Sequence, residues 1–152
     1  MGKIIGYMTT WTTYGTWLQG DKREYVKDGQ ILRENDALLK SNLKNLRNLA
    51  TRLNTKHCAI IRHAILNKAQ EIRQHIYAIA VCSNHVHIVA ERINESIEKV
   101  VSFYKNAARL ALRSNGFVGR IWTKGFDKRF CFNQEELEKK IKYVNDHHNP
   151  NG

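Results

Sequence analysis

The centre of the chain carries the run Val81-Cys82-Ser83-Asn84-His85-Val86-His87-Ile88-Val89-Ala90-Glu91. Alternate side chains of a β-strand point to the same face, so His85 and His87 are predicted to lie side by side, about 6.6 Å apart along the strand. Two imidazoles at that spacing can bind one divalent cation or one phosphate. The pair can equally be two hydrogen-bonded structural histidines, because short motifs of this kind also occur by chance.

The residues before the histidines indicate a β-hairpin. Residues 77–82 form a second apolar stretch, and the Ser83-Asn84 pair between the two stretches is typical of a turn. We therefore expect a hairpin over residues 77–92, with both histidines near its tight end.

Length and charge restrict the classes of function. The 152 residues predict a single domain over residues 1–152. Lys and Arg number 25 against 14 Asp and Glu, which gives a net charge of +11 spread along the sequence. A folded basic domain most often binds nucleic acid, although a solvated basic surface without a polyanionic partner has the same totals.

Three cysteines, Cys58, Cys82 and Cys131, lie far apart in the sequence and form no Cys-x-x-Cys pair. They predict small core residues in a reducing compartment, without disulfides or a zinc site. The N-terminus lacks an apolar secretory signal, and no apolar run approaches the roughly 20 residues that span a bilayer. These features predict a cytoplasmic location and no membrane partner.

Hydrophobic periodicity predicts the other elements. β-Branched and aromatic residues over 4–18 predict a strand, and residues 19–36 form a polar excursion. Apolar residues at three- and four-residue steps predict helices over 37–53, 56–75 and 95–114. Together with a strand before the last helix, this order predicts an α+β fold, an antiparallel sheet with helices packed on one face.

Basic and aromatic residues are mixed between positions 117 and 132. Rings that stack on bases, beside cations that contact phosphates, are typical of proteins that bind single-stranded nucleic acid. An edge strand whose aromatic residues face the core would have the same composition. The candidate DNA-binding residues in this segment are Arg120, Trp122, Lys124, Lys128 and Arg129.

The C-terminal part of the chain predicts an amphipathic helix that begins after Asn133, a suitable N-cap. Tyr143 lies about 100° around the helix from Val144, and His147 lies one turn beyond Tyr143 on the same face. A phenol and an imidazole would then project together, although an exposed tyrosine and a solvated histidine give the same pattern. The buried stripe of this helix is predicted to be Leu137, Ile141 and Val144.

The helix and the hairpin together suggest a catalytic site. His85, His87 and His147 could form a three-ligand metal site beside Tyr143. A phenol is a weak nucleophile on its own. A cation that neutralises a bound phosphate would make in-line attack by Tyr143 feasible.

Four segments in the same order resemble one known family. Residues 83–89 resemble the HUH motif of single-tyrosine transposases, and Tyr143-Val144 ahead of Asn149-Pro150 resembles the tyrosine helix of the REP-associated tyrosine transposases. Residues 11–21 resemble the N-terminal signature of that branch, and residues 121–127 resemble its aromatic-Gly-aromatic-Asp segment. The HUH motif alone is a weak signal, whereas four motifs in order are a specific one.

The resemblance implies a ferredoxin-like, RRM-like sheet with a C-terminal tyrosine-bearing helix. It implies that the protein cleaves single-stranded or hairpin DNA with Mg²⁺ or Mn²⁺, forming a 5′-phosphotyrosine and a free 3′-hydroxyl that later rejoins strands. His85 and His87 match the metal ligands, Tyr143 matches the nucleophile, and His147 matches the position of a third ligand. The expected protein is a monomer or homodimer associated with a prokaryotic nucleoid.

Two other classes of function fit part of the sequence. One is a nucleic-acid-binding module of the same fold that has lost catalysis, which the intact His85, His87 and Tyr143 argue against. The other is a nucleotide hydrolase of the histidine-triad type. That motif needs a third alternate histidine where this chain has Val89.

Overall fold

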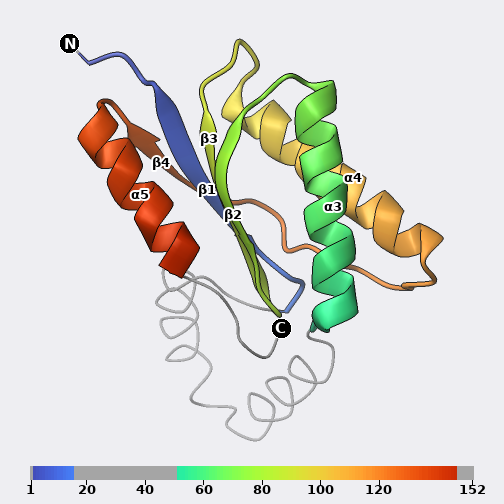
Figure 1. The fold of residues 1–152 in the computed structure, drawn as a ribbon. Coiled ribbons are helices and arrows are strands. Elements are labelled where there is room, and N and C mark those ends of the chain that lie inside the picture. The colour runs from blue at the N-terminus through green and yellow to red at the C-terminus, as the bar shows by residue number, and fades with distance from the viewer. Residues whose placement is uncertain (1, 16–50, 147–152) are drawn as a thin grey trace, which may run out of the picture.

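The computed structural model describes residues 2–15 and 51–146, which form a sheet with a helical layer on each side (Figure 1). The strands are β1 (Gly6–Thr12), β2 (Ile76–Val81), β3 (His85–Glu91) and β4 (Asp127–Cys131). The helices are α3 (Thr55–Glu71), α4 (Ile97–Ser114) and α5 (Gln134–Asp146).

The four strands form one antiparallel sheet in the order β2-β3-β1-β4. With the chain order β1-α3-β2-β3-α4-β4, this is the ferredoxin-like arrangement, so the predicted α+β class is confirmed. Helices α3 and α4 share one face of the sheet, as expected. The C-terminal helix α5 covers the opposite face (Figure 1), a placement that its amphipathic pattern alone did not specify.

The predicted hairpin is present as β2 and β3. Its turn is closed by the backbone N–H of Cys82, which donates to the carbonyl of His85 over 2.8 Å. Strand β3 lies inside the sheet, between β2 and β1. Its residues Val86, Ile88 and Ala90 belong to the core under α3 and α4, so by alternation the histidines and Val89 face α5.

Helix α3 starts at the N-cap Asn54, whose side chain accepts a hydrogen bond from the backbone of His57. It ends at Glu71, earlier than the predicted 56–75, because Arg73 has a φ of 59° and the chain turns inward. The turn buries Gln74, whose Nε2 donates to the hydroxyl of Tyr7 over 2.7 Å. A buried polar partner on the sheet therefore decides where this helix stops.

The last predicted helix is α5, and Asn133 caps it by accepting a hydrogen bond from the backbone N–H of Glu136 over 2.9 Å. Leu137 and Val144 are buried against a core that includes Met8 and Cys131. This packing confirms the predicted stripe and fixes how the helix is rotated over the sheet.

Two predictions differ from the structure or lie outside it. Strand β1 is shorter than the predicted 4–18, and in the mixed 117–132 segment the strand is β4, at the edge of the sheet. The polar excursion and residues 37–50 of a predicted helix lie outside the described residues. Residues 51–53, which are described, are not helical.

Backbone hydrogen bonds join four distant segments at the histidine end of the sheet, and we call this set the junction. The N–H of Thr51 donates to the carbonyl of Tyr14 over 2.7 Å, and the N–H of Tyr14 donates to Ile121 over 2.7 Å. The N–H of Leu53 donates to the carbonyl of Ser83 over 2.8 Å, beside the hairpin turn. The junction therefore holds the hairpin turn and the end of β1 in place.

The three cysteines are buried and form no disulfide, as the sequence predicts. Burial raises the pKa of each thiol, so all three remain protonated core side chains at neutral pH. Within residues 2–15 and 51–146, no helix has the length and apolar character needed to cross a membrane.

Candidate active site

His85 and His87 lie side by side on the face of β3 that α5 covers. Their ring centroids are 4.7 Å apart and the ring planes are inclined by 74°. The side chain of His87 is only 6 % exposed, whereas that of His85 is half-buried. Two imidazoles on a central strand of a sheet form a rigid pair.

The Nδ1 atom of each histidine is engaged by a neighbour. Nδ1 of His85 donates to Oδ1 of Asn84 over 2.7 Å, because an amide oxygen can only accept. Nδ1 of His87 is hydrogen-bonded to Oγ1 of Thr10 over 2.8 Å, in a buried pair between β3 and β1. Nε2 is then the nitrogen through which each ring would coordinate a cation, an arrangement typical of metal-binding histidines.

Tyr143 stands over this pair. Its ring centroid lies 5.7 Å from that of His87, with the ring planes inclined by 77°. The side chain is 49 % exposed, because the buried stripe of α5 turns Val144 into the core and leaves its neighbour at the edge of the interface. Two histidines and one tyrosine, about 56 residues apart in sequence, thus meet in one place.

The other described tyrosines are in less suitable positions for attack on a substrate. Tyr7 and Tyr104 are buried, and burial raises the pKa of both phenols. Tyr14 and Tyr77 are partly buried. Among the tyrosines that the structure describes, Tyr143 has the most exposed side chain, and it is the one in ring contact with the histidine pair.

The residues present fit a divalent cation in part. His85 and His87 supply two imidazole ligands, and the hydrogen bonds at Nδ1 already orient both rings. No group of three or more His, Cys, Asp or Glu residues that could hold a metal occurs among residues 2–15 and 51–146. His147, the predicted third ligand, lies outside the described residues.

An acidic side chain shares a row of the sheet with this site. In the register of the strands, His87 pairs with Thr10, and Thr10 pairs with Asp127 of β4. Paired residues of an antiparallel sheet point to the same face, so Asp127 also faces α5. Its Oδ2 accepts a hydrogen bond from Nε of Arg129 over 3.1 Å, which compensates its charge.

The predicted DNA-binding residues lie on β4 and on the segment that precedes it. Lys128 and Arg129 are exposed neighbours on β4 and point to opposite faces, Lys128 toward Glu98 of α4 and Arg129 toward the α5 side. Lys124 is exposed in the loop before β4. The guanidinium of Arg120 lies over the ring of Tyr14, with 4.8 Å from its Cζ to the ring centroid.

Trp122 differs from the four basic residues because it is mostly buried. Its ring lies edge-on against Trp11, with centroids 6.0 Å apart, and its Nε1 donates to the carbonyl of Lys105 over 3.0 Å. This aromatic residue therefore faces the core, the alternative that the composition left open. The role of all five residues in DNA binding stays a prediction.

Sequence reasoning missed the hydrogen-bond partners of Nδ1 in both histidines. Thr10 is 77 residues away from His87, and no local pattern links them. Asn84 was predicted as a turn residue, but its position next to His85 was a usable signal for a second role.

Comparison with solved structures finds proteins of similar fold. The structure superposes on a REP-associated tyrosine transposase bound to a REP hairpin with a TM-score of 0.58 and 14% sequence identity, over 95% of this chain and 67% of that chain. It also resembles a candidate transposase from Deinococcus radiodurans R1, with a TM-score of 0.49 and 12% identity, over 97% of this chain and 94% of that one. No protein-family model and no curated protein matches the chain. The first match shows that the chain has the fold of that transposase.

Proposed function

We propose that this chain is a transposase that cuts and rejoins single-stranded or hairpin DNA, with Tyr143 as the nucleophile. The observation that carries the proposal is the meeting of Tyr143 with His85 and His87 on one face of the sheet. Support comes from the net charge of +11 and from the fold shared with a transposase that binds a DNA hairpin. A histidine pair with a purely structural role would not need an exposed phenol beside it.

The proposed reaction exchanges one phosphoester for another. Oη of Tyr143 attacks the phosphorus of the DNA backbone and loses its proton to solvent. The bond from phosphorus to the 3′-oxygen breaks, and this oxygen takes up a proton to become a free 3′-hydroxyl. The 5′-phosphate stays on Tyr143, and attack by a 3′-hydroxyl reverses the exchange and joins strands.

The histidines would hold the cofactor of this reaction. Mg²⁺ or Mn²⁺ bound there would withdraw negative charge from the phosphate oxygens and stabilise the leaving oxygen. Nε2 of His85 and of His87 would be the protein ligands, and Asn84 and Thr10 would keep both rings oriented through Nδ1. His147 is the proposed third ligand.

Substitution of Tyr143 by Phe tests the proposal most directly. The variant keeps the ring against His87 and removes only the hydroxyl, so it should fold and bind Mn²⁺ as the parent does. The covalent adduct with a labelled single-stranded hairpin oligonucleotide, resolved on a denaturing gel, should disappear. Tyr77→Phe is the matched control, because Tyr77 also packs on the α5 side but has its ring contact with His75 and not with the histidine pair of β3.

An adduct formed by Tyr143→Phe at the parental yield would refute the role of this tyrosine. Parental protein that binds the oligonucleotide but never forms an adduct, with Mn²⁺ present, would instead favour the binding module without catalysis.

A further inference from the structure

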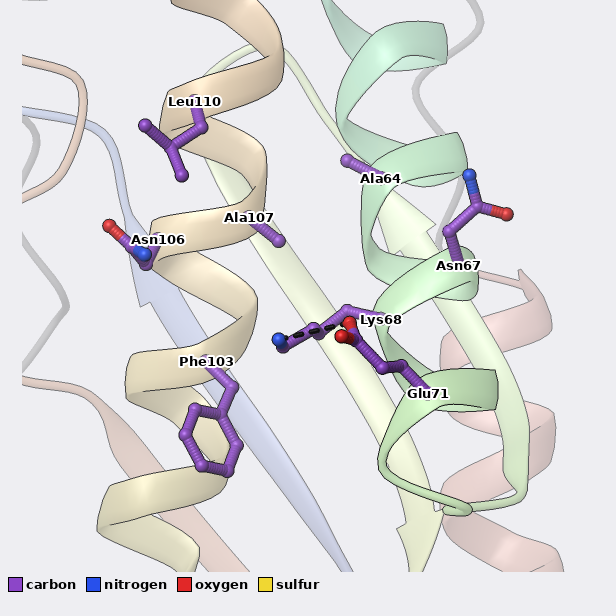
Figure 2. Close-up of a pocket in the computed structure, with 8 residues that line it drawn as sticks. All are labelled: Ala64, Asn67, Lys68, Glu71, Phe103, Asn106, Ala107 and Leu110. Atoms are coloured by element: carbon purple, nitrogen blue, oxygen red, sulfur yellow. Dashed lines mark ion pairs between the residues drawn. The ribbon is translucent and has the colours of Figure 1, made fainter.

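Two hollows of similar size flank helix α4 on the face of the sheet opposite the histidines. One lies between α3 and α4, with a volume of about 330 Å³, and Figure 2 shows the side chains that line it. The other lies between α4 and the loop before β4, with a volume of about 380 Å³. We call the second one the α4–β4 hollow.

In the α3–α4 hollow the positive charge of Lys68 is already paired with a negative charge. Nζ of Lys68 lies 3.0 Å from Oε2 of Glu71 (the dashed line in Figure 2) and 5.5 Å from the ring centroid of Phe103. Its cation is thus paired with a carboxylate and an aromatic ring. The described residues that line this hollow therefore leave no unpaired cation to bind an anionic ligand.

The α4–β4 hollow contains two cations, Lys105 and Arg109, that lack such pairing. Among the described residues, no carboxylate oxygen lies within 4 Å of a charged nitrogen of either side chain. Arg109 is exposed and donates to Oδ1 of Asn106 over 2.7 Å. Glu98 is the one acidic residue among the described residues that line this hollow, and its Oε2 lies 3.7 Å from the ammonium of Lys128.

Lys105 is held in a fixed position. Its Nζ donates to the carbonyl of Thr123 over 3.0 Å and to that of Gly125 over 2.7 Å. An ammonium has three N–H groups, so these two bonds leave one for a ligand. Burial lowers the pKa of Lys105, which is the expected effect on a cation that no anion compensates.

The same hollow has an aromatic wall. Phe126 is half-buried, packs against the core under α4 and lines the hollow with its exposed part. Cations that contact phosphates beside a ring that can stack on a base are the two components of a single-stranded nucleic-acid site.

We propose that the α4–β4 hollow binds one nucleotide of single-stranded DNA, with its phosphate on Lys105 and Arg109 and its base on Phe126. This inference rests on the proposed function and adds a second DNA contact on the far side of the sheet from Tyr143. A compensated pair such as Lys68 and Glu71 would not provide this contact in the α3–α4 hollow.

The position of the hollow explains how one strand could reach both sites. Phe126 directly precedes Asp127, the first residue of β4, and β4 is the edge strand. Asp127 is in register with Thr10 and so with His87 on the other face. DNA held in the hollow would pass over the β4 edge, between Lys128 on one face and Arg129 on the other, to reach the histidines.

Fluorescence anisotropy with a labelled oligothymidylate tests this site separately from catalysis. All proteins carry Tyr143→Phe and are measured in EDTA, so neither cleavage nor a bound metal contributes. Arg109→Gln should weaken binding about five-fold or more and lower the slope of log affinity against log salt by about 0.7, the value for one phosphate contact. Phe126→Leu should weaken binding about five-fold without changing that slope, because stacking is not ionic.

Arg113→Gln is the matched control, since Arg113 lies one turn further along α4, is exposed and does not line the hollow. Equal losses for Arg109→Gln and Arg113→Gln would overturn the proposal, because they would indicate a diffuse positive surface. Parental affinity of Phe126→Leu would also overturn it. If a thermal melt shows that Phe126→Leu is not folded, the difference in affinity between Arg109→Gln and Arg113→Gln still tests the proposal. If the anisotropy gives such a result while the parental protein still forms its covalent adduct through Tyr143, the hollow is refuted as a DNA-binding site and the proposed function stands.

Discussion

The two faces of the sheet are covered differently. The face under α3 and α4 carries a deep apolar core that includes Trp11, Ile61 and Leu112, all fully buried. Among the described residues, the opposite face is covered by the single helix α5, and its smaller core consists mostly of short side chains such as Ala78 and Ala80. The histidines and Tyr143 are on this second face.

The difference indicates how stability and chemistry are separated in this fold. Two helices with large apolar side chains can stabilise the sheet from one side, because hydrophobic stabilisation scales with the apolar area removed from water. The other side then needs less apolar cover and can hold polar side chains at the end of the sheet. The edge of α5 leaves Tyr143 half-exposed, which a fully packed face would not allow.

The largest expected effect is on metal binding by the thinly covered face. His87→Ala should lower the affinity for Mn²⁺ by more than about 100-fold. Removing a residue that only orients a ligand typically lowers metal affinity about 10- to 100-fold, and removing the ligand itself should lower it more. Calorimetry with Mn²⁺ measures this. His63→Ala, an exposed histidine of α3 on the other side of the sheet, should bind as the parent does. Unchanged binding by His87→Ala would assign the pair a structural role.

A second pair of variants compares the two cores. Leu112→Ala and Leu137→Ala both remove a buried leucine, at a typical cost of about 2–5 kcal/mol in the free energy of unfolding. We expect the loss of unfolding free energy to lie near the upper end of this range for Leu112→Ala and near the lower end for Leu137→Ala, as measured by urea denaturation. Leu137→Ala should also weaken Mn²⁺-dependent adduct formation, since it loosens α5, whereas folded Leu112→Ala should not. The opposite order of stabilities would contradict the assignment of the main core.

A smaller effect is expected from the outer partner of His87. Thr10→Val keeps the shape of the side chain and removes the hydroxyl that bonds Nδ1, so Mn²⁺ affinity should fall about ten-fold. Thr10→Ser should restore most of it. If both variants bind Mn²⁺ as the parent does, Thr10 only packs against the ring.

The smallest effect concerns the ligand proposed beyond α5. His147→Ala should weaken Mn²⁺ binding by only a few-fold, because water can replace one ligand of a partly aqueous site. A loss as large as that of His87→Ala would make His147 an equal partner of the hairpin histidines. The same calorimetric titration distinguishes the two results.

Local patterns predicted much of this molecule. Alternation predicted the hairpin and the shared face of its histidines, and the three- and four-residue spacing predicted α4, α5 and the position of Tyr143 off the buried stripe. These features depend on residues that are close in sequence. The same reasoning correctly predicted Asn133 as the cap of α5.

The features that sequence reasoning missed depend on contacts between distant segments. The bond of Thr10 to His87 joins two strands, and the inward turn at Gln74 that shortens α3 depends on a hydroxyl of β1. Trp122 belongs to a basic and aromatic segment, yet it is buried, because its ring packs against Trp11 and its Nε1 donates to the carbonyl of Lys105. Composition could not distinguish that outcome from an exposed stacking platform.

The junction has a consequence for how this chain can vary. Strand β1 ends at Thr12, and two residues later a backbone hydrogen bond of 2.7 Å joins Tyr14 to Thr51, which precedes α3. The entropy of closing a segment between fixed ends grows only with the logarithm of its length, about 0.6 kcal/mol for each doubling. The change in closure entropy caused by an insertion or deletion between these residues is therefore small. As far as this entropy is concerned, the number of residues between Tyr14 and Thr51 can vary in evolution at little expense to the stability of the sheet.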